Sequence, residues 1–237
     1  TYLRWTEFAT FSPIMRFHGV TPREPWAYSR YAVSVYKFYA WLRENLLKYS
    51  VHTAEEAHKT GIPMMRPLPM VFPEDKEAVY WEDEYFYGSD LLVAPVHQEG
   101  EKRRIYFPSG SWINLLDFRK MVGGNRIFQV DVPIDKIPVY IREGACILSV
   151  MNGELQLGQS MTYEKKNTVL MSRALNETSG KRYADGKEIE YNILGKTGED
   201  FFMLRHAFET EFIVLLGFDR KPDRKSTRLN SSHQVRS

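Results

Sequence analysis

Arg16 and His18 are the two residues whose types and spacing point most directly to chemistry. They lie in a short apolar stretch, residues 14–19, which follows Pro13 and ends at Gly19. A run of this length between Pro and Gly favours a buried strand over a helix. Residues two apart share one face of a strand, so the two side chains would project together. A guanidinium can hold a carboxylate and an imidazole can bond vicinal hydroxyls; the alternative is a buried histidine beside a structural ion pair.

A second candidate is the Glu55-Glu56-Ala57-His58 motif with the nearby His52. A Glu-x-x-His spacing places two possible metal ligands on one helical face, but a dimetal site of that kind needs two such motifs and two further carboxylates. We therefore interpret this segment as a solvated helical face. There is no Gly-rich phosphate loop, calcium loop, His-Glu-x-x-His or Gly-x-Ser-x-Gly motif. The single cysteine, Cys146, cannot form an internal disulfide or a thiolate metal site.

The elements around these candidates begin with helices. Residues 27–60 have the length and periodicity of one or two amphipathic helices. One apolar stripe is built from residues three or four apart, namely Val35, Phe38, Leu42, Leu46 and Tyr49. Glu44 lies four residues before Lys48, which favours a helical ion pair. Gly61 followed by Pro63 predicts the end of the helix.

From residue 64 onward the pattern changes to short strands separated by Gly and Pro. Strands are expected within 90–96, 104–107, 128–132 and 137–148, the last being two strands around a Glu143-Gly144 turn. A more variable β module follows over 155–219, with a turn at 183–187 and a last strand at 212–216. Short strands at this close spacing, separated by turn residues, indicate β-sandwiches. The order of elements fits the end of a βα barrel followed by β modules, although the reverse topology is also open.

Composition excludes several classes. Of 237 residues, 43% are hydrophobic and 26% charged, which is the balance of a globular chain. No apolar run approaches the roughly 20 residues that span a bilayer, so we expect no membrane insertion. Residues 224–237 hold four basic residues, no acid and no aromatic, and account for more than the whole net charge of +2. We expect this tail to be disordered and non-native, and therefore expect no nucleic-acid partner.

Six ordered motifs carry a resemblance to a known family. They are FSPIMRFHG at 11–19, PREPW at 22–26, GIPMMRPL at 61–68, YGSDLLVAPV at 87–96, YFPSGSW at 106–112 and IPVYIREG at 137–144. Together they resemble glycoside hydrolase family 31, the α-glucosidase and α-xylosidase family. The resemblance covers residues 1 to about 150 and fades beyond them.

The resemblance implies an α/β plus all-β fold, the C-terminal part of a (β/α)8 TIM barrel followed by two antiparallel β-sandwich domains. Residues 1–60 would be the last part of the catalytic barrel. Residues 61–150 would be the proximal sandwich and 151–223 the distal one, with 224–237 as the foreign tail.

The resemblance also implies a retaining, exo-acting α-glycosidase that hydrolyses terminal α-linked glucose or xylose from oligosaccharides through a glycosyl–aspartate intermediate. His18 would bind hydroxyls of the sugar in the −1 subsite, and Arg16 would lie beside it and orient a carboxylate. Asp90 and Arg142 are expected to be structural. No metal or other cofactor is implied.

Both catalytic aspartates would precede Thr1. The carboxylates of the barrel portion match no catalytic motif: Glu7, Glu24, Glu44, Glu55 and Glu56. We therefore expect no catalytic residue in this chain and no activity from it alone. The alternative is a non-catalytic β-sandwich module that binds carbohydrate or docks a partner through exposed aromatic side chains.

Overall fold

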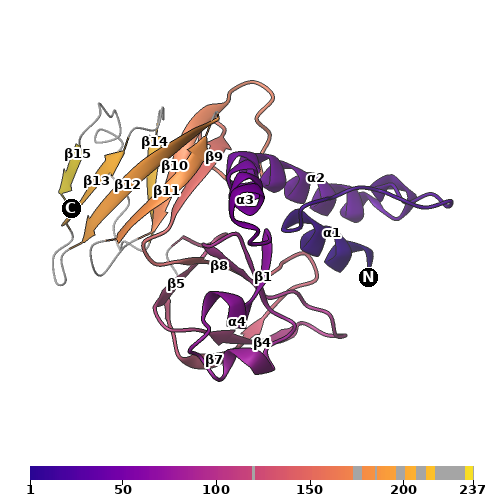
Figure 1. Ribbon diagram of the computed structural model, residues 1–237. Coiled ribbons are helices and arrows are strands. Elements are labelled where there is room, and N and C mark those ends of the chain that lie inside the picture. Colours follow the sequence, from indigo (N-terminus) through magenta and orange to yellow (C-terminus); the bar gives the residue numbers. More distant parts are fainter. Residues whose placement is uncertain are drawn as a thin grey trace.

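The chain begins with three helices and continues as β-structure (Figure 1). The computed structural model describes residues 1–118, 121–172, 178–184, 186–195, 201–206, 212–216 and 233–236. Helix α1 (Tyr2–Thr10) is followed by a loop that contains the 3₁₀ turn η1 (Pro25–Ala27), and then by α2 (Arg30–Asn45) and α3 (Leu47–Thr60). None of the described helices has the length and apolarity needed to cross a bilayer.

Local signals set the limits of these helices. The Ser29 hydroxyl caps α2 by accepting a hydrogen bond from the backbone N–H of Ala32 at 3.0 Å. Leu46 lies outside helical geometry (φ −91°, ψ 9°) and separates α2 from α3. Gly61 ends α3 with a positive φ of 77°, as predicted. Because the helix is interrupted, the Glu44 carboxylate does not pair with Lys48 as expected, and it binds the Lys165 ammonium at 3.0 Å.

The first β unit is a six-stranded sheet packed on a two-stranded one. The sheet order is β1 (Met65–Pro67), β2 (Tyr85–Tyr87), β3 (Leu91–Val93), β8 (Val139–Arg142), β5 (Ser111–Asn114) and β6 (Met121–Gly123), all antiparallel. The second sheet pairs β4 (Lys102–Phe107) with β7 (Arg126–Asp131). Helix α4 (Leu68–Val71) and the 3₁₀ turn η2 (Ala78–Tyr80) precede β2. An aromatic core that includes Phe86, Phe107, Trp112 and Tyr140 fills the space between the two sheets.

The second β unit also contains two sheets. Strand β10 (Lys166–Ser172) pairs antiparallel with β9 (Cys146–Met151) and parallel with β14 (Phe212–Leu216). The other sheet is antiparallel, in the order β11 (Thr178–Ala184), β12 (Lys187–Gly195), β13 (Phe201–His206) and β15 (His233–Arg236). A small core that includes Cys146, Leu148, Met171 and Tyr191 lies between them. The predicted turn at 183–187 is the β11–β12 hairpin, of which Asp185 lies outside the described residues.

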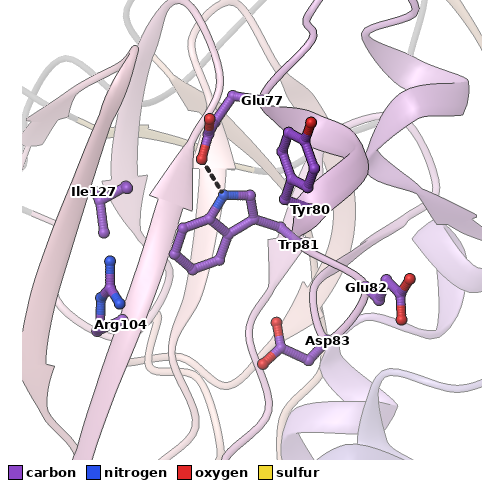
Figure 2. Close-up of a pocket in the computed structure, with 7 residues that line it drawn as sticks. All are labelled: Glu77, Tyr80, Trp81, Glu82, Asp83, Arg104 and Ile127. Atoms are coloured by element: carbon purple, nitrogen blue, oxygen red, sulfur yellow. Dashed lines mark hydrogen bonds between the residues drawn. The ribbon is translucent and has the colours of Figure 1, made fainter.

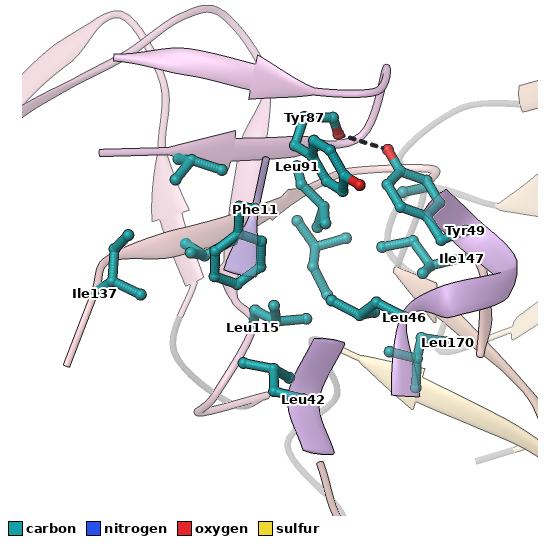
Figure 3. Packing of buried hydrophobic residues seen from close by; sticks show 14 of the residues in the cluster. Phe11, Leu42, Leu46, Tyr49, Tyr87, Leu91, Leu115, Ile137, Ile147 and Leu170 are labelled. Atoms are coloured by element: carbon teal, nitrogen blue, oxygen red, sulfur yellow. Dashed lines mark hydrogen bonds between the residues drawn. The ribbon is translucent and has the colours of Figure 1, made fainter. Parts of the chain in front are cut away.

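One central core joins the helices to both β units (Figure 3). Leu42 and Leu46 of the predicted apolar stripe pack there with Leu91 of β3 and Leu170 of β10. Leu91 faces this core while its neighbour Leu92 faces the aromatic core, so β3 is buried on both faces, as its continuous apolar sequence predicts.

Residues 14–19 do not form the predicted buried strand. Ile14 is 73% and Phe17 41% exposed, and the segment has no regular secondary structure. A strand satisfies its backbone groups only beside another strand. No described strand lies beside this segment, so its backbone faces solvent as a loop.

The strand pairing differs from the sequence prediction at the boundary between the two β units and in the C-terminal tail. Strand β9 pairs with β10, so the chain passes from the first unit to the second near Gly144, ahead of the predicted limit at residue 150. Residues 233–236, expected to be disordered, form β15 at the edge of the second unit, because an open sheet edge can pair with any extended segment. The rest of the predicted tail, 224–232 and 237, lies outside the described residues.

Candidate functional site

The structure brings Arg16 and His18 together on the loop between α1 and α2. One guanidinium nitrogen of Arg16 (Nη2) donates a hydrogen bond to Nδ1 of His18 at 2.5 Å. Both side chains are exposed, so they lie together on a loop that is open to solvent and not on the face of a buried strand. In Figure 1 the loop runs along the helices and projects away from the β units.

Arg43 of α2 holds the base of this loop. Its Nη1 donates to the carbonyl oxygens of Ala9, Thr10 and Ser12, and its Nη2 donates to that of Pro13. These carbonyls end α1 or follow it, where helices run out of internal donors; that of Ala9 also accepts a hydrogen bond from the backbone N–H of Ser12 at 3.3 Å. One arginine therefore fixes the direction in which the chain leaves α1, three residues before Arg16.

Two contacts shape the rest of the loop. The ring of Phe17 packs against Tyr36 of α2 with centroids 4.9 Å apart. Gly19 has a φ of 151°, and a Cβ at this position would lie 2.0 Å from Nε of Arg23. Only glycine fits there without displacing Arg23. His18 therefore lies between Phe17, which packs on α2, and Gly19, whose backbone lies close to the Arg23 side chain.

Three carboxylates of the N-terminal region, besides Glu44, have structural partners. Glu7 is buried and accepts a hydrogen bond from Arg4, and burial raises the pKa of its carboxyl to about 8. Glu24 accepts from the backbone N–H of Arg23, and Glu56 forms an ion pair with Arg66.

His52 does not belong to the solvated helical face that the sequence indicates for this segment. His52 is buried, and its Nδ1 accepts a hydrogen bond from the backbone N–H of Tyr183 at 3.0 Å. Burial, with the nearby guanidiniums of Arg182 and Arg66, lowers the pKa of this imidazole to about 3, so it is neutral at physiological pH. His58 is exposed on α3. Within the described residues no group of three or more His, Cys, Asp or Glu side chains is placed to hold a metal ion.

Asp90 and Arg142 have structural surroundings. Asp90 forms a buried ion pair with Arg182 of β11, whose Nη2 lies 2.5 Å from the carboxylate. The Arg142 guanidinium lies 5.2 Å from the ring centroid of Phe72. The Asp90–Arg182 pair joins the first β unit to the second, a contact that spacing along the chain does not reveal.

A cavity of about 1030 Å³ lies between α1 and the first β unit. Trp5 and Phe8 of α1 line one side, and Met65 and Tyr85 line another. Trp5 is 66% exposed. Arg16 and His18 do not line this cavity. The sequence gives no signal for it, because its walls come from segments that are distant along the chain.

Glu84 lies against the same cavity as a buried carboxyl with an incomplete set of partners. Its Oε1 accepts from the backbone N–H of Tyr106 at 3.0 Å and lies 3.7 Å from Arg103, and its Oε2 is buried with no partner in the described structure. Burial raises the pKa of this carboxyl to about 8 from the usual 4.5. The neutral form is therefore favoured in the folded chain.

We expect Glu84→Gln to be more stable than the parent chain at neutral and mildly alkaline pH. A raised folded-state pKa gives stability that is complete below pH 4.5 and is lost as the pH rises to about 8. The two proteins differ by one titrating carboxyl, so their free energies of unfolding can diverge by at most about 1.4 kcal/mol per pH unit. Urea unfolding of both proteins from pH 4 to pH 9 measures it. Parallel curves would show that Glu84 is ionised in the folded chain.

Two family models match the chain in the order of its structural parts. The model described as the TIM-barrel domain of glycosyl hydrolases family 31 matches residues 1–53, which hold α1, α2 and the loop with Arg16 and His18. The model described as the glycosyl hydrolase family 31 C-terminal domain matches residues 61–147, which hold the first β unit.

Individual proteins agree with these models. The chain is 34% identical to an isomaltosyltransferase of Sporosarcina globispora over 66% of its own length, and 34% identical to an α-xylosidase of Saccharolobus solfataricus over 62%. It spans 16% and 20% of these relatives. The structure of a cycloalternan-forming enzyme from Listeria monocytogenes superimposes with a TM-score of 0.82 at 26% identity, over 90% of this chain and 22% of that one. These matches show that the chain belongs to glycoside hydrolase family 31.

Proposed function

We propose that the chain is part of a retaining, exo-acting α-glycosidase that removes terminal α-linked glucose or xylose from oligosaccharides. The observation that carries this proposal is the Arg16–His18 pair, held on a loop of the segment that matches the family's barrel model. Retaining glycosidases need two carboxyl groups about 5–5.5 Å apart. Glu7, Glu24, Glu44 and Glu56 make structural contacts, and in this proposal both catalytic aspartates lie on preceding barrel strands.

In this proposal each residue of the pair has a distinct role. An arginine can only donate, so Nδ1 of His18 is the acceptor in their hydrogen bond. A neutral His18 then carries its proton on Nε2 and presents that N–H to a sugar hydroxyl. Arg16 acts as a positioning residue, because its hydrogen bond selects the tautomer of His18. Its remaining N–H groups are available to a carboxylate.

Exposed apolar surface supports the assignment of 1–60 to the end of a larger barrel. The exposed large side chains of this region include Trp5, Ile14, Val20, Trp26 and Tyr28. A surface with so many large apolar groups is typical of an interface. We propose that the rest of the barrel covers it, and that the two β units are the proximal and distal sandwiches of the family.

We expect the 237-residue chain to release no nitrophenol from aryl α-glucosides or α-xylosides. Residues 1–150 should restore hydrolysis when they replace the corresponding segment of the Saccharolobus solfataricus α-xylosidase, since that protein is 34% identical to this chain over 149 residues. Circular dichroism confirms that the chimera is folded. Turnover by the isolated chain, or a folded chimera without turnover, would contradict the proposal.

The alternative function is a non-catalytic module that binds carbohydrate. The observation that favours it is an open pocket beside two aromatic side chains in the first β unit. A pocket of this kind is compatible with either function, because a glycosidase can hold its substrate chain away from the reacting bond.

A further inference from the structure

A pocket of about 490 Å³ opens on the outer face of the first β unit, between η2 and the β4–β7 sheet (Figure 2). This volume lies within the range of about 300–1,000 Å³ that is typical of small-molecule sites. Its walls include Tyr80, Trp81, Glu82, Arg104 and Ile127. None of these residues contributes to the Arg16–His18 loop.

The two-stranded sheet forms the floor of this pocket. Arg104 and Tyr106 lie two residues apart on β4 and therefore share one face. Ile127 of β7 pairs directly with Tyr106 and lies on the same face. Ile105 and Phe107 belong to the aromatic core. Tyr106 is also buried, at 5% exposed, and its ring stacks with that of Trp81, so the side chains that face outward are those of Arg104 and Ile127. Ile127 is 43% exposed even though the core behind it is closed.

Trp81 is held over this outward face in one orientation. Its indole N–H donates to the Glu77 carboxylate at 3.0 Å, a contact visible in Figure 2. The Trp81 ring is nearly parallel to that of Tyr106, with an interplanar angle of 19° and centroids 5.8 Å apart. The Arg104 guanidinium lies 5.8 Å from the centroid of the Trp81 ring. Trp81 is half-buried, so part of the ring stays open to the pocket. A rigid aromatic surface binds a flat ligand without the entropic cost of ordering a mobile side chain.

Three polar groups around the indole have hydrogen-bonding capacity that no described residue uses. The Tyr80 hydroxyl, the Glu82 carboxylate and the Arg104 guanidinium make no hydrogen bond or ion pair there. The Tyr80 side chain is 77% exposed. The pocket therefore combines an apolar ring with free donors and free acceptors. A pyranose has the complementary pattern, because its C–H face is apolar and its hydroxyls both donate and accept.

The charge of the pocket argues against an anionic ligand. Glu77, Glu82 and Asp83 contribute three carboxylates; Arg104 supplies one guanidinium, and Arg103 pairs with Asp83 at 2.8 Å, which leaves one negative charge in excess. A phosphate or a nucleic acid backbone would meet a net negative potential here. A neutral, hydroxyl-rich ligand avoids this repulsion and can use the carboxylates as acceptors.

We propose that this pocket is a non-catalytic binding site for a pyranose unit of an α-glucan, with the ring stacked on Trp81 and flanked by Tyr80. The α-linkage rests on the proposed function, whereas the pyranose chemistry rests on the pocket itself. The site holds a substrate chain at the first β unit, away from the Arg16–His18 loop.

Affinity electrophoresis of the 237-residue chain tests the site. The chain should be retarded in native gels that contain dextran, a soluble α-glucan, relative to gels without polysaccharide. Tyr80→Ala and Arg104→Ala remove groups that have no intramolecular hydrogen bond, so both should fold and weaken binding, Tyr80→Ala by about tenfold. Tyr163→Ala is the matched control, since Tyr163 is fully exposed and lies outside the pocket, and it should bind as the parent does.

Absence of retardation, or equal retardation of the parent and Tyr80→Ala, would overturn the proposal. Retardation only in gels that contain the β-glucan hydroxyethylcellulose would overturn the α-glucan assignment and with it the proposal. Binding is measured on a chain that is expected to have no catalytic aspartates, so it does not depend on turnover. If the chain does not bind dextran but the chimera is active, the binding-site proposal is wrong and the proposed hydrolytic function is unaffected.

Discussion

Replacing Asp90 with alanine is expected to lower the free energy of unfolding by about 3–5 kcal/mol, the usual cost of removing one partner of a buried ion pair. Asp90 and Arg182 are each almost fully buried, so the variant leaves an uncompensated guanidinium in the interior. Arg182 cannot relax toward water, because its Nε donates to the Cys146 carbonyl at 2.7 Å and its guanidinium lies 4.9 Å from the Tyr191 ring centroid. Urea unfolding followed by tryptophan fluorescence measures the change.

The exposed Glu44–Lys165 pair is the matched control for Asp90→Ala. Both of its side chains are largely exposed, and Glu44→Ala should cost no more than about 1 kcal/mol. The double variant Asp90→Asn/Arg182→Met removes both charges together. Its free energy of unfolding should therefore fall by less than the sum of the losses in Asp90→Asn and Arg182→Met alone. Equal effects of Asp90→Ala and Glu44→Ala would show that the Asp90–Arg182 pair does not join the two β units energetically.

The parts of the fold that the sequence predicts are those with local causes. The stripe through Leu42, Leu46 and Tyr49 lies on one side of α2 and α3 because helical periodicity alone places those residues together. Gly61 ends α3 through its own backbone freedom. The continuous apolar stretch at 91–93 predicts a strand buried on both faces because no polar face is provided for solvent.

The parts that the sequence does not predict depend on distant partners. Residues 14–19 have the composition of a buried strand, but a strand also needs a neighbour, and composition does not say whether one is present. Asp90 and Arg182 are 92 positions apart, so neither residue identifies the other in the sequence. Cys146 begins a strand of the second β unit although only a short turn separates it from β8, since strand pairing, not proximity along the chain, decides the sheet.

The candidate sites divide in the same way. Arg16 and His18 are neighbours along the chain and lie in contact, but on a loop and not on the shared strand face from which the sequence argument started. The anchoring of their loop by Arg43 does not follow from sequence, because four carbonyl oxygens must converge on one guanidinium. The Trp81 pocket likewise needs the β4–β7 pairing before its floor exists.

In an active chimera of residues 1–150 with the Saccharolobus solfataricus α-xylosidase, we expect His18→Ala to lower kcat/KM by about 100-fold or more. Removal of one well-placed donor at a reacting centre costs about 10²–10³ in rate. Hydrogen bonds to sugar hydroxyls strengthen as the ring approaches the oxocarbenium-like transition state, so the loss should fall mainly on kcat. Steady-state hydrolysis of a nitrophenyl α-glycoside separates kcat from KM.

Arg16 and His58 give the comparisons that make His18→Ala decisive. Arg16→Ala removes the hydrogen bond that selects the Nε2–H tautomer but leaves the imidazole in place, so its loss of kcat should be smaller than that of His18→Ala. Arg16→Lys retains a donor toward Nδ1 and should recover part of that loss. His58→Ala changes an exposed imidazole on α3 and should hydrolyse the substrate as the chimera does. A His18→Ala chimera as active as His58→Ala would exclude His18 from the sugar site, because an imidazole that binds the reacting ring cannot be removed without cost.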